Sequence, residues 1–487
     1  MSNATSKTPN KGSVIDPHGL DLFRLTMMVI TASICGGIFA LAGDMAAGGA
    51  STGAVLISWV ICFAGVFSLM MCFNGLSQAR PDLTGGIYAY AAAGFGKFVG
   101  FNSAWGYWIS ACLSNVSFAI LLFSALGYFF HPFESGNNLL SCICASAFLW
   151  LLVWLVSRGV KEAAGINVIV TLAKLVPLAL FVLSIVLLGK FDPAIFMENF
   201  WGEAGGPDLG TQIISTMIAL VWVFTGIEGA VVISGRAKYA RDVGRATVIG
   251  FVSVFVLYLI ISLESMGVMP RAQMAELATP SMAGILEHAI GPIGASIVNL
   301  GVVLSLLGAM LGYVIIASET PFEAARQGVF PKSFARTNKN GAPIVTVLIS
   351  AAITQLFLIV SVFSESTYQF FYACAVSTIL IPYVCSAAYY MKIAWKKNVS
   401  PDQVRKARLL GTAGFVYTVF LVWAAGVVGV MITTILFAPG IIVYVVGQRE
   451  RGEAILPNRV DKIIAVVIVV LMMISIGLMA TGTIQVL

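Results

Sequence analysis

The stretch Met28–Gly43, MVITASICGGIFALAG, lies inside the first long apolar segment of the chain, yet its centre is a poor helix. Gly36 and Gly37 stand side by side directly after Cys35, and each glycine costs a helix about 1 kcal/mol relative to alanine. Inside a membrane, a broken backbone persists only where it is buried in protein or lines a cavity. The stretch therefore predicts either a helix interrupted at a solute site, as in transporters, or close helix packing through small residues.

A second interrupted apolar segment, in the other half of the chain, favours the transporter alternative. Val221–Ser234, VWVFTGIEGAVVIS, contains Gly226 and Gly229 with Glu228 between them. Two glycine-interrupted spans in corresponding halves are typical of the substrate site of a secondary transporter, and an acid at membrane depth is a functional candidate. The pair therefore indicates a transport site built from broken helices.

The composition is that of a polytopic membrane protein. Of the 487 residues, 59% are hydrophobic and 10% are charged, and the mean hydropathy is +0.94, whereas a soluble domain carries about 25% charged residues. Residues 1–19 are polar and are expected to form a cytoplasmic tail and not a signal peptide. The eight cysteines lack metal-binding spacing and the three histidines form no catalytic constellation. We therefore expect no enzyme, no metal site and no cofactor.

At about 20 residues per spanning helix, the sequence predicts thirteen transmembrane helices. The eleventh and twelfth are short and nearly contiguous. The expected spans are 22–45, 52–78, 99–130, 139–157, 165–189, 210–234, 246–268, 290–318, 343–362, 368–391, 411–430, 431–448 and 461–485.

The basic residues agree with this topology when the N-terminus is placed inside. The predicted inner segments then hold 25 of the 28 Lys and Arg residues, and the outer loops keep only Lys190 and Arg271. The net charge of +6 is therefore a topology signal, and no nucleic-acid partner is expected. The outer loops are acidic, which either attracts cationic solutes or is ordinary solvated loop surface.

Two polar side chains stand out inside the predicted spans. Lys174 lies about nine residues into the fifth span and is followed by Pro177. A buried ammonium needs a partner, and we expect it to donate to carbonyls freed by the break at Gly36; the alternative is snorkelling to an interface. Asn115 is a lone amide in the middle of the third span, which suits either a helix–helix hydrogen bond or a contact to a substrate.

Three aromatic residues, Trp222, Phe224 and Tyr313, could close over a cation by cation–π attraction. Single aromatics in membrane helices also serve as packing or interface residues. The aromatic residues alone therefore leave the two alternatives open.

Several motifs are spread over essentially the whole chain. They are SICGGIF at 33–39, TGGIYAYAAAGFGKFVGF at 84–101, YW and SN within 107–115, VWVFTGIEGA at 221–230 and ASETPFEAARQGVFPKSFARTNKNGAPIVT at 317–346. Together they resemble the amino acid–polyamine–organocation superfamily. The subgroup that they resemble most is the basic amino acid/polyamine antiporters, such as the arginine/ornithine exchangers, and the presence of a thirteenth helix is similar to that branch.

This resemblance implies an all-α LeuT-type fold with two inverted five-helix repeats at 20–190 and 209–395, followed by extra helices at 410–487. In the family, the broken first and sixth helices hold the α-carboxylate and α-ammonium of an amino acid. Gly36 and Gly37 would then offer N–H groups to the carboxylate, in a Cys-Gly-Gly run where the arginine/agmatine exchanger has Gly-Ser-Gly. The ammonium would bind carbonyls near Ser33, Ile34, Trp222 and Thr225.

The resemblance also implies roles for side chains. Trp222 matches the aromatic gate, Asn115 the amide that binds the substrate side chain, and Glu228 the acid after the sixth-helix break. Lys174 resembles a fifth-helix lysine that occupies a sodium-site position, which argues against sodium coupling. The remaining candidates for contact with the substrate are Ser110, Phe118 and Tyr313, of which Tyr313 stands where the arginine/agmatine exchanger has Trp.

The function that the resemblance implies is exchange of a cationic amino acid for its metabolic product across a bacterial cytoplasmic membrane. Arginine for ornithine is the expected pair, and lysine/cadaverine, histidine/histamine and agmatine/putrescine remain open. The alternative is a proton-coupled amino acid uptake carrier. The expected partners are the amino acid, its product and the lipid bilayer. A homodimer is one option for the oligomeric state.

Overall fold

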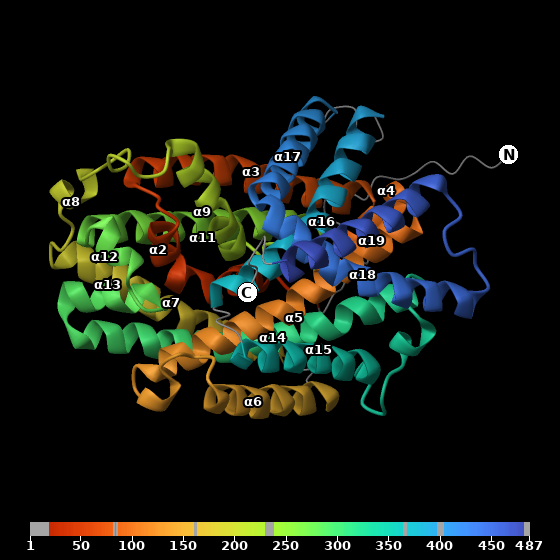
Figure 1. Ribbon diagram of the computed structural model, residues 1–487, viewed down its shortest axis with the longest axis horizontal. Coiled ribbons are helices and arrows are strands. Elements are labelled where there is room, and N and C mark those ends of the chain that lie inside the picture. The colour runs from red at the N-terminus through yellow and green to blue at the C-terminus, as the bar shows by residue number, and fades with distance from the viewer. Residues whose placement is uncertain are drawn as a thin grey trace.

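The computed structural model describes residues 19–80, 83, 86–159, 163–228, 238–363, 368–396 and 404–481, without the side chains of 163–173 and 240–241. All the regular elements in these ranges are helices (Figure 1). Eleven of the described helices are long and apolar enough to cross a membrane, counting the first, broken one once. Two shorter apolar stretches, Lys174–Leu187 and Leu209–Val223, fill the other two expected positions. The chain is therefore a multi-pass membrane protein, as predicted.

The helices fall into two halves and a C-terminal group. The first half contains α1 (Leu22–Ser33), α2 (Gly37–Ala47), α3 (Thr52–Ala79), α4 (Ile87–Phe95), α5 (Lys97–Gly127), α6 (Leu139–Ser157), α7 (Ala163–Leu187) and α8 (Pro193–Met197). The second half contains α9 (Leu209–Val223), α11 (Ala240–Val268), α12 (Arg271–Ala275), α13 (Ser281–Ile290), α14 (Pro292–Arg326), α15 (Ile344–Phe363) and α16 (Tyr368–Trp395). The C-terminal group is α17 (Val404–Ala424), α18 (Gly426–Arg451) and α19 (Arg459–Ala480).

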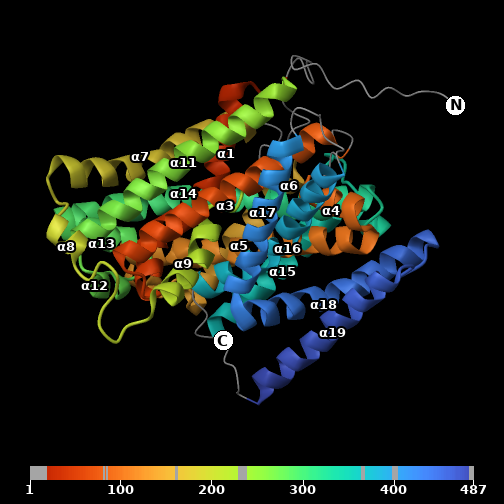
Figure 2. The same ribbon diagram turned by 90° about the horizontal axis from the view of Figure 1, so that it is seen from above.

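Helix α5 forms the centre of the bundle. It lies in the middle of both views and packs against α14 and α16 (Figures 1 and 2). Nearly all of its residues are buried, because it is apolar or small-sided on every face. Small residues allow its backbone to approach α16, since a side chain at Gly106 would lie 2.6 Å from the carbonyl oxygen of Thr378.

Helices α18 and α19 lie as a pair at one edge of the bundle (Figure 2). Helix α19 exposes most of its apolar side chains, and its buried residues are Asp461, Ala465 and Ser475. In a bilayer such a face is covered by lipid, which is as apolar as the side chains that it meets.

Several predicted span boundaries differ from the helix ends, and two of the differences have a clear local cause. The eleventh and twelfth spans meet at Ala425 and not at residue 430, because Gly426, with φ of +66°, makes the turn inside one continuous apolar run. Hydropathy alone cannot place such a turn. The eighth span was expected to end at 318, but α14 continues to Arg326 and ends where Gly328 takes a φ of +80°. Its polar last turns extend the same helix beyond the apolar stretch.

Side-chain acceptors start several helices. Asp21 accepts a hydrogen bond from the N–H of Arg24, and Asn138 accepts one from the N–H of Ser141. Asp208 caps α9, and the hydroxyl and backbone N–H of Thr211 hold the pKa of its carboxyl below the usual range. These caps fix where the chain enters the helices, so they position the residues that follow.

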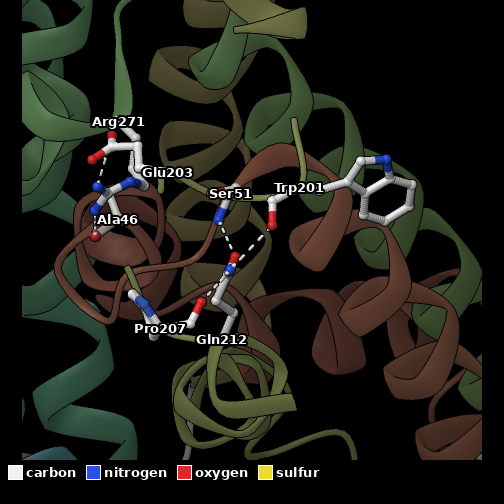
Figure 3. Close-up of polar contacts among 7 residues, drawn as sticks. All are labelled: Ala46, Ser51, Trp201, Glu203, Pro207, Gln212 and Arg271. Atoms are coloured by element: carbon white, nitrogen blue, oxygen red, sulfur yellow. Dashed lines mark hydrogen bonds and ion pairs between the residues drawn. The ribbon is translucent and has the colours of Figure 1, made fainter. Parts of the chain in front are cut away.

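The start of α3 is tied to the start of α9 by Gln212, which is buried (Figure 3). Its Oε1 accepts from the N–H of Ser51, the N-cap of α3, at 2.9 Å, and its Nε2 donates to the carbonyls of Trp201 at 3.3 Å and Pro207 at 2.9 Å. One side chain of α9 therefore joins this helix to the start of α3 and to the loop before α9.

A second tie uses an ion pair at the same end of the bundle. Arg271, at the start of α12, donates through Nη2 to Glu203 Oε1 at 2.9 Å and through Nη1 to the carbonyl of Ala46 at 3.4 Å (Figure 3). Because Ala46 lies in the last turn of α2, the guanidinium also faces the negative end of that helix dipole.

We expect Gln212→Leu to lower the apparent Tm of the purified protein by about 2–6 °C, since it leaves up to three buried backbone groups without their partner. The measurement is thermal unfolding in detergent followed by intrinsic fluorescence. Gln273→Leu, on the exposed side of α12, is the matched control and is expected to change Tm little. Equal Tm values for the two variants would contradict the role given to Gln212.

Candidate functional site

The first helix is broken where the sequence predicted. Helix α1 ends at Ser33 and α2 begins at Gly37, with Ile34 in a non-helical conformation (φ −80°, ψ 86°). The break frees the last carbonyls of α1 from the usual helical pattern. In a membrane each of them needs another donor.

The structure supplies a donor for each of these carbonyls. The carbonyl of Ile30 accepts the N–H of Ile34 at 2.8 Å, and that of Ser33 accepts the N–H of Cys35 at 3.0 Å. The Cys35 thiol lies 3.3 Å from the carbonyl of Ala32. The last one, Thr31, is reached by a residue from another helix.

Lys174 and Tyr258 complete this set from α7 and α11. Lys174 is 1% exposed, and its Nζ lies 3.3 Å from the carbonyl oxygen of Thr31, so the expected contact with the break is present. Tyr258 donates its hydroxyl to the carbonyl of Ser33 at 2.9 Å. The Ser33 carbonyl thus already has two donors, and a substrate ammonium could bind it only by displacing one.

The start of α2 presents backbone N–H groups instead. Its N-cap is Gly36, which provides no side-chain cap, so the first N–H groups have no intrahelical acceptor. Aligned peptide dipoles also make this end partly positive. The start of α2 is therefore suited to a carboxylate.

Both glycines at this point are closely packed. A side chain at Gly36 would lie 2.5 Å from Leu121, and one at Gly37 would lie 2.8 Å from both Trp222 and Val223. The end of α9 therefore lies directly against the start of α2.

The second break adjoins the first. Helix α9 ends at Val223, and the chain continues in turns to Glu228, through Gly226 with φ of +99°. A side chain at Gly226 would lie 2.6 Å from the carbonyl oxygen of Ala32 in α1. The sixth span is therefore interrupted at Gly226, as the sequence predicts; Gly229 and residues 230–234 of the expected span 210–234 lie outside the described residues. The two interruptions form one site.

An aromatic lid, consisting of Phe118, Trp222, Tyr368 and Tyr372, covers the start of α2. The Trp222 indole stacks on Tyr372 with centroids 5.5 Å apart and 16° between the planes, and its Nε1 donates to the Tyr368 hydroxyl at 2.7 Å. Phe118 contacts Trp222 at 5.5 Å and meets Tyr313 edge-on at 5.0 Å. The structure thus brings together Phe118, Trp222 and Tyr313, three of the residues that the sequence analysis names as candidates for contact with the substrate.

Glu228 lies at the far end of the second break and is fully enclosed. Tyr107 from α5 donates to its Oε1 at 3.0 Å, and Tyr383 from α16 donates to its Oε2 at 2.8 Å. The sequence analysis missed both tyrosines, because a single tyrosine in an apolar helix carries no signal that distinguishes it from a packing residue.

Asn115 is buried in α5, and one of its polar side-chain atoms has no hydrogen-bond partner among the described residues. Its amide nitrogen reaches only the carbonyl of Ala111, at 3.5 Å, and its Oδ1 has no partner among the described residues. Ser110 is buried one turn and a half earlier, and its carbonyl accepts from Ser114. The Thr225 hydroxyl bonds back to the carbonyl of Val221 at 3.2 Å. Of these polar candidates, Asn115 alone keeps a buried acceptor unused.

Adjoining breaks in the first and sixth spans of an all-helical bundle define a LeuT-type transporter fold, as predicted. A model of the amino acid permease family matches residues 20–447. The chain therefore belongs to the amino acid permease family.

Relatives cover nearly the whole chain. It is 42% identical over 471 residues to the arginine/ornithine antiporter of Pseudomonas aeruginosa, covering 94% of this chain and 97% of that protein. It is 38% identical over 450 residues to a putative arginine/ornithine antiporter of Escherichia coli strain K12, covering 91% and 95%. It is 34% identical over 496 residues to the arginine/agmatine antiporter of Chlamydia abortus, covering both chains in full.

Gly37→Val is expected to abolish substrate binding without preventing insertion, because its side chain would collide with Trp222 and Val223 at the break. Binding of radiolabelled arginine to purified protein is the measurement, with size-exclusion chromatography as the folding check. Gly477→Val, at an open position on α19, serves as the control. Normal binding by Gly37→Val would place the site elsewhere.

Proposed function

We propose that the protein is an antiporter that exchanges a cationic amino acid for its metabolic product by alternating access, with arginine and ornithine as the pair. The observation that carries the proposal is the adjoining pair of backbone breaks beneath an aromatic lid. The substrate class comes from the relatives, which are named as arginine/ornithine and arginine/agmatine antiporters.

The backbone of the site discriminates the two ends of an α-amino acid. The first N–H groups of α2, at Gly36 and Gly37, receive the α-carboxylate at the positive end of the helix. The α-ammonium binds carbonyls at Ile34 and at the end of α9, near Trp222 and Thr225. Because the Ser33 carbonyl already accepts from Cys35 and Tyr258, it takes part only if one of these donors moves.

The side-chain end of the substrate is directed toward α5. Asn115 Oδ1 is a buried acceptor without a donor, which is costly unless a ligand supplies one. The rings of Phe118 and Tyr313, two of the residues proposed to contact the substrate, lie against each other. They suit a guanidinium or ammonium by cation–π attraction. Ser110 remains a proposed contact on the same helix.

Lys174 replaces a sodium ion as the fixed positive charge behind the first break. Its ammonium satisfies the carbonyl of Thr31, which a coordinated cation would otherwise satisfy. Transport therefore does not depend on a sodium gradient.

Glu228 acts as a gating or coupling group. Its two tyrosine donors come from α5 and α16, so the carboxyl joins the second break to two other helices. A change of its charge or partners would alter the closure of the bundle on that side, while Trp222 closes the opposite side.

We also propose that the two inverted repeats occupy 20–190 and 209–395, after a tail at 1–19 and before the added helices at 410–487. In each half, short helices are inserted between the second and third spans: α4 in the first, and α12 and α13 in the second. This shared order supports a duplicated unit.

The proposed location is a bacterial cytoplasmic membrane, with the N-terminus in the cytoplasm. Lys97 pairs with Glu453 at 2.6 Å, and both belong to predicted inner segments. Arg271 pairs with Glu203, and both belong to predicted outer loops. The ion pairs thus agree with the charge-based topology. A carrier of this kind performs no catalysis, binds lipid around its spans and is compatible with a homodimer.

Counterflow in proteoliposomes tests the proposed function. Uptake of labelled arginine is expected only when the vesicles contain unlabelled ornithine or arginine, because exchange requires a substrate on the other side. Uptake into empty vesicles driven by a proton gradient would instead indicate a proton-coupled carrier. A screen of lysine, histidine, agmatine and their products as internal substrates identifies the pair.

Exchange is expected to proceed equally in sodium and in potassium buffers, and Lys174→Ala is expected to lose it, because the substitution removes the buried ammonium that donates to the carbonyl of Thr31. Initial rates of arginine/ornithine exchange are the measurement, and Lys190→Ala, which removes an exposed lysine, is the control. Strong sodium stimulation of the wild type, or full activity of Lys174→Ala, would falsify this role.

Asn115→Leu is expected to weaken arginine binding about tenfold or more while leaving Tm unchanged, because the substitution removes an acceptor that the folded protein leaves unused. Short neutral analogues such as alanine should lose less. Asn299→Leu is a matched control, since Asn299 in α14 is equally buried and also has an unpartnered Oδ1 among the described residues. An equal loss for arginine and alanine would contradict the role of Asn115.

A further inference from the structure

We infer that Asp44 is an outer recognition residue for the cationic end of the substrate, and that its bonds to α16 hold the aromatic lid closed until a cation replaces them. This inference rests on the proposed function and its topology. Asp44 is not among the site residues that the sequence predicts. In this proposal it selects for the positive charge of the substrate, on the far side of the aromatic lid from the break at Gly37.

Asp44 lies in α2 seven residues after Gly37, about 10 Å along the helix axis. Its Oδ1 accepts from Gln369 Nε2 at 3.0 Å, and its carboxylate also hydrogen-bonds to Tyr372. The same Gln369 nitrogen reaches the Thr279 hydroxyl at 3.2 Å. The carboxylate thus joins α2 to α16 and to the loop before α13.

This junction is connected directly to the lid. Tyr372, which bonds to Asp44, is the ring that stacks on Trp222. Trp222 in turn lies against Gly37 and donates to Tyr368, one turn before Tyr372 on α16. Separation of α16 from Asp44 would therefore loosen the stack over the break.

The charge of Asp44 is not neutralised within the described residues. Its partners there are a neutral amide and a phenol, and no described ion pair includes it. Two other acids at this end of the bundle are engaged: Glu203 pairs with Arg271, and Asp208 caps α9. Asp44, Gln369 and Thr279 are all partly exposed.

A cationic substrate can compete for this carboxylate. A guanidinium or ammonium adds the attraction between opposite charges to its hydrogen bonds with a carboxylate, and the neutral Gln369 amide lacks that attraction. An arriving cation therefore displaces the Gln369 amide, frees α16 from α2 and opens the lid. A neutral amino acid offers no such exchange, so the step selects for charge before the substrate reaches Asn115.

The test compares Asp44→Asn with wild type in right-side-out and inside-out membrane vesicles loaded with ornithine. In right-side-out vesicles, the KM for external arginine should rise about tenfold, because charge-assisted binding is lost, while the KM for citrulline, its uncharged isostere, should not change. In inside-out vesicles the KM for arginine should stay at the wild-type value, which also shows that the variant folds. Glu287→Gln, an exposed acid on α13, controls for general surface charge and should match wild type.

A second variant separates recognition from closure. Gln369→Leu keeps the carboxylate but removes the competing amide, so the external KM for arginine should fall and not rise. A rise in both variants, or equal shifts for arginine and citrulline in Asp44→Asn, would overturn the inference while leaving exchange by the wild type intact. If the wild type itself shows no exchange, the proposed function fails instead.

Discussion

The need to satisfy backbone groups freed inside a membrane governs this structure. At the end of α1, each freed carbonyl has a donor, supplied by the local chain or by Lys174 and Tyr258. At the start of α2, the freed N–H groups lie beside Gly36 without a side-chain cap. This asymmetry leaves the N–H end open while it closes the carbonyl end, and under the proposed function it would orient an amino acid by its carboxylate.

The remaining architecture places other groups around that break. Gly226 allows the second break to lie against α1, and Trp222 then covers Gly37. At the end of the bundle away from the breaks, Gln212 ties α9 to the start of α3, and Arg271 ties α12 to the end of α2 and to the loop before α9. Asp44 joins α2 to α16.

The sequence predicts the features that have a local cause. Paired glycines at Gly36 and Gly37 locate the first break, apolar length locates the thirteen spans, and the charge of Lys174 requires a partner. The sequence does not predict the turn at Gly426 inside a continuous apolar run, nor the partners Tyr258, Tyr107 and Tyr383. Those contacts join helices far apart in the chain, and a tyrosine has the same local pattern whether it packs or donates. The roles of the site residues stay predictions.

A structure of the protein with bound arginine in lipid nanodiscs tests the central claim most directly. The account predicts the α-carboxylate within hydrogen-bonding distance of the N–H groups at Gly36 and Gly37, with the guanidinium toward Asn115. Arginine bound away from both breaks, or with its carboxylate at the carbonyl end of α1, would contradict the account.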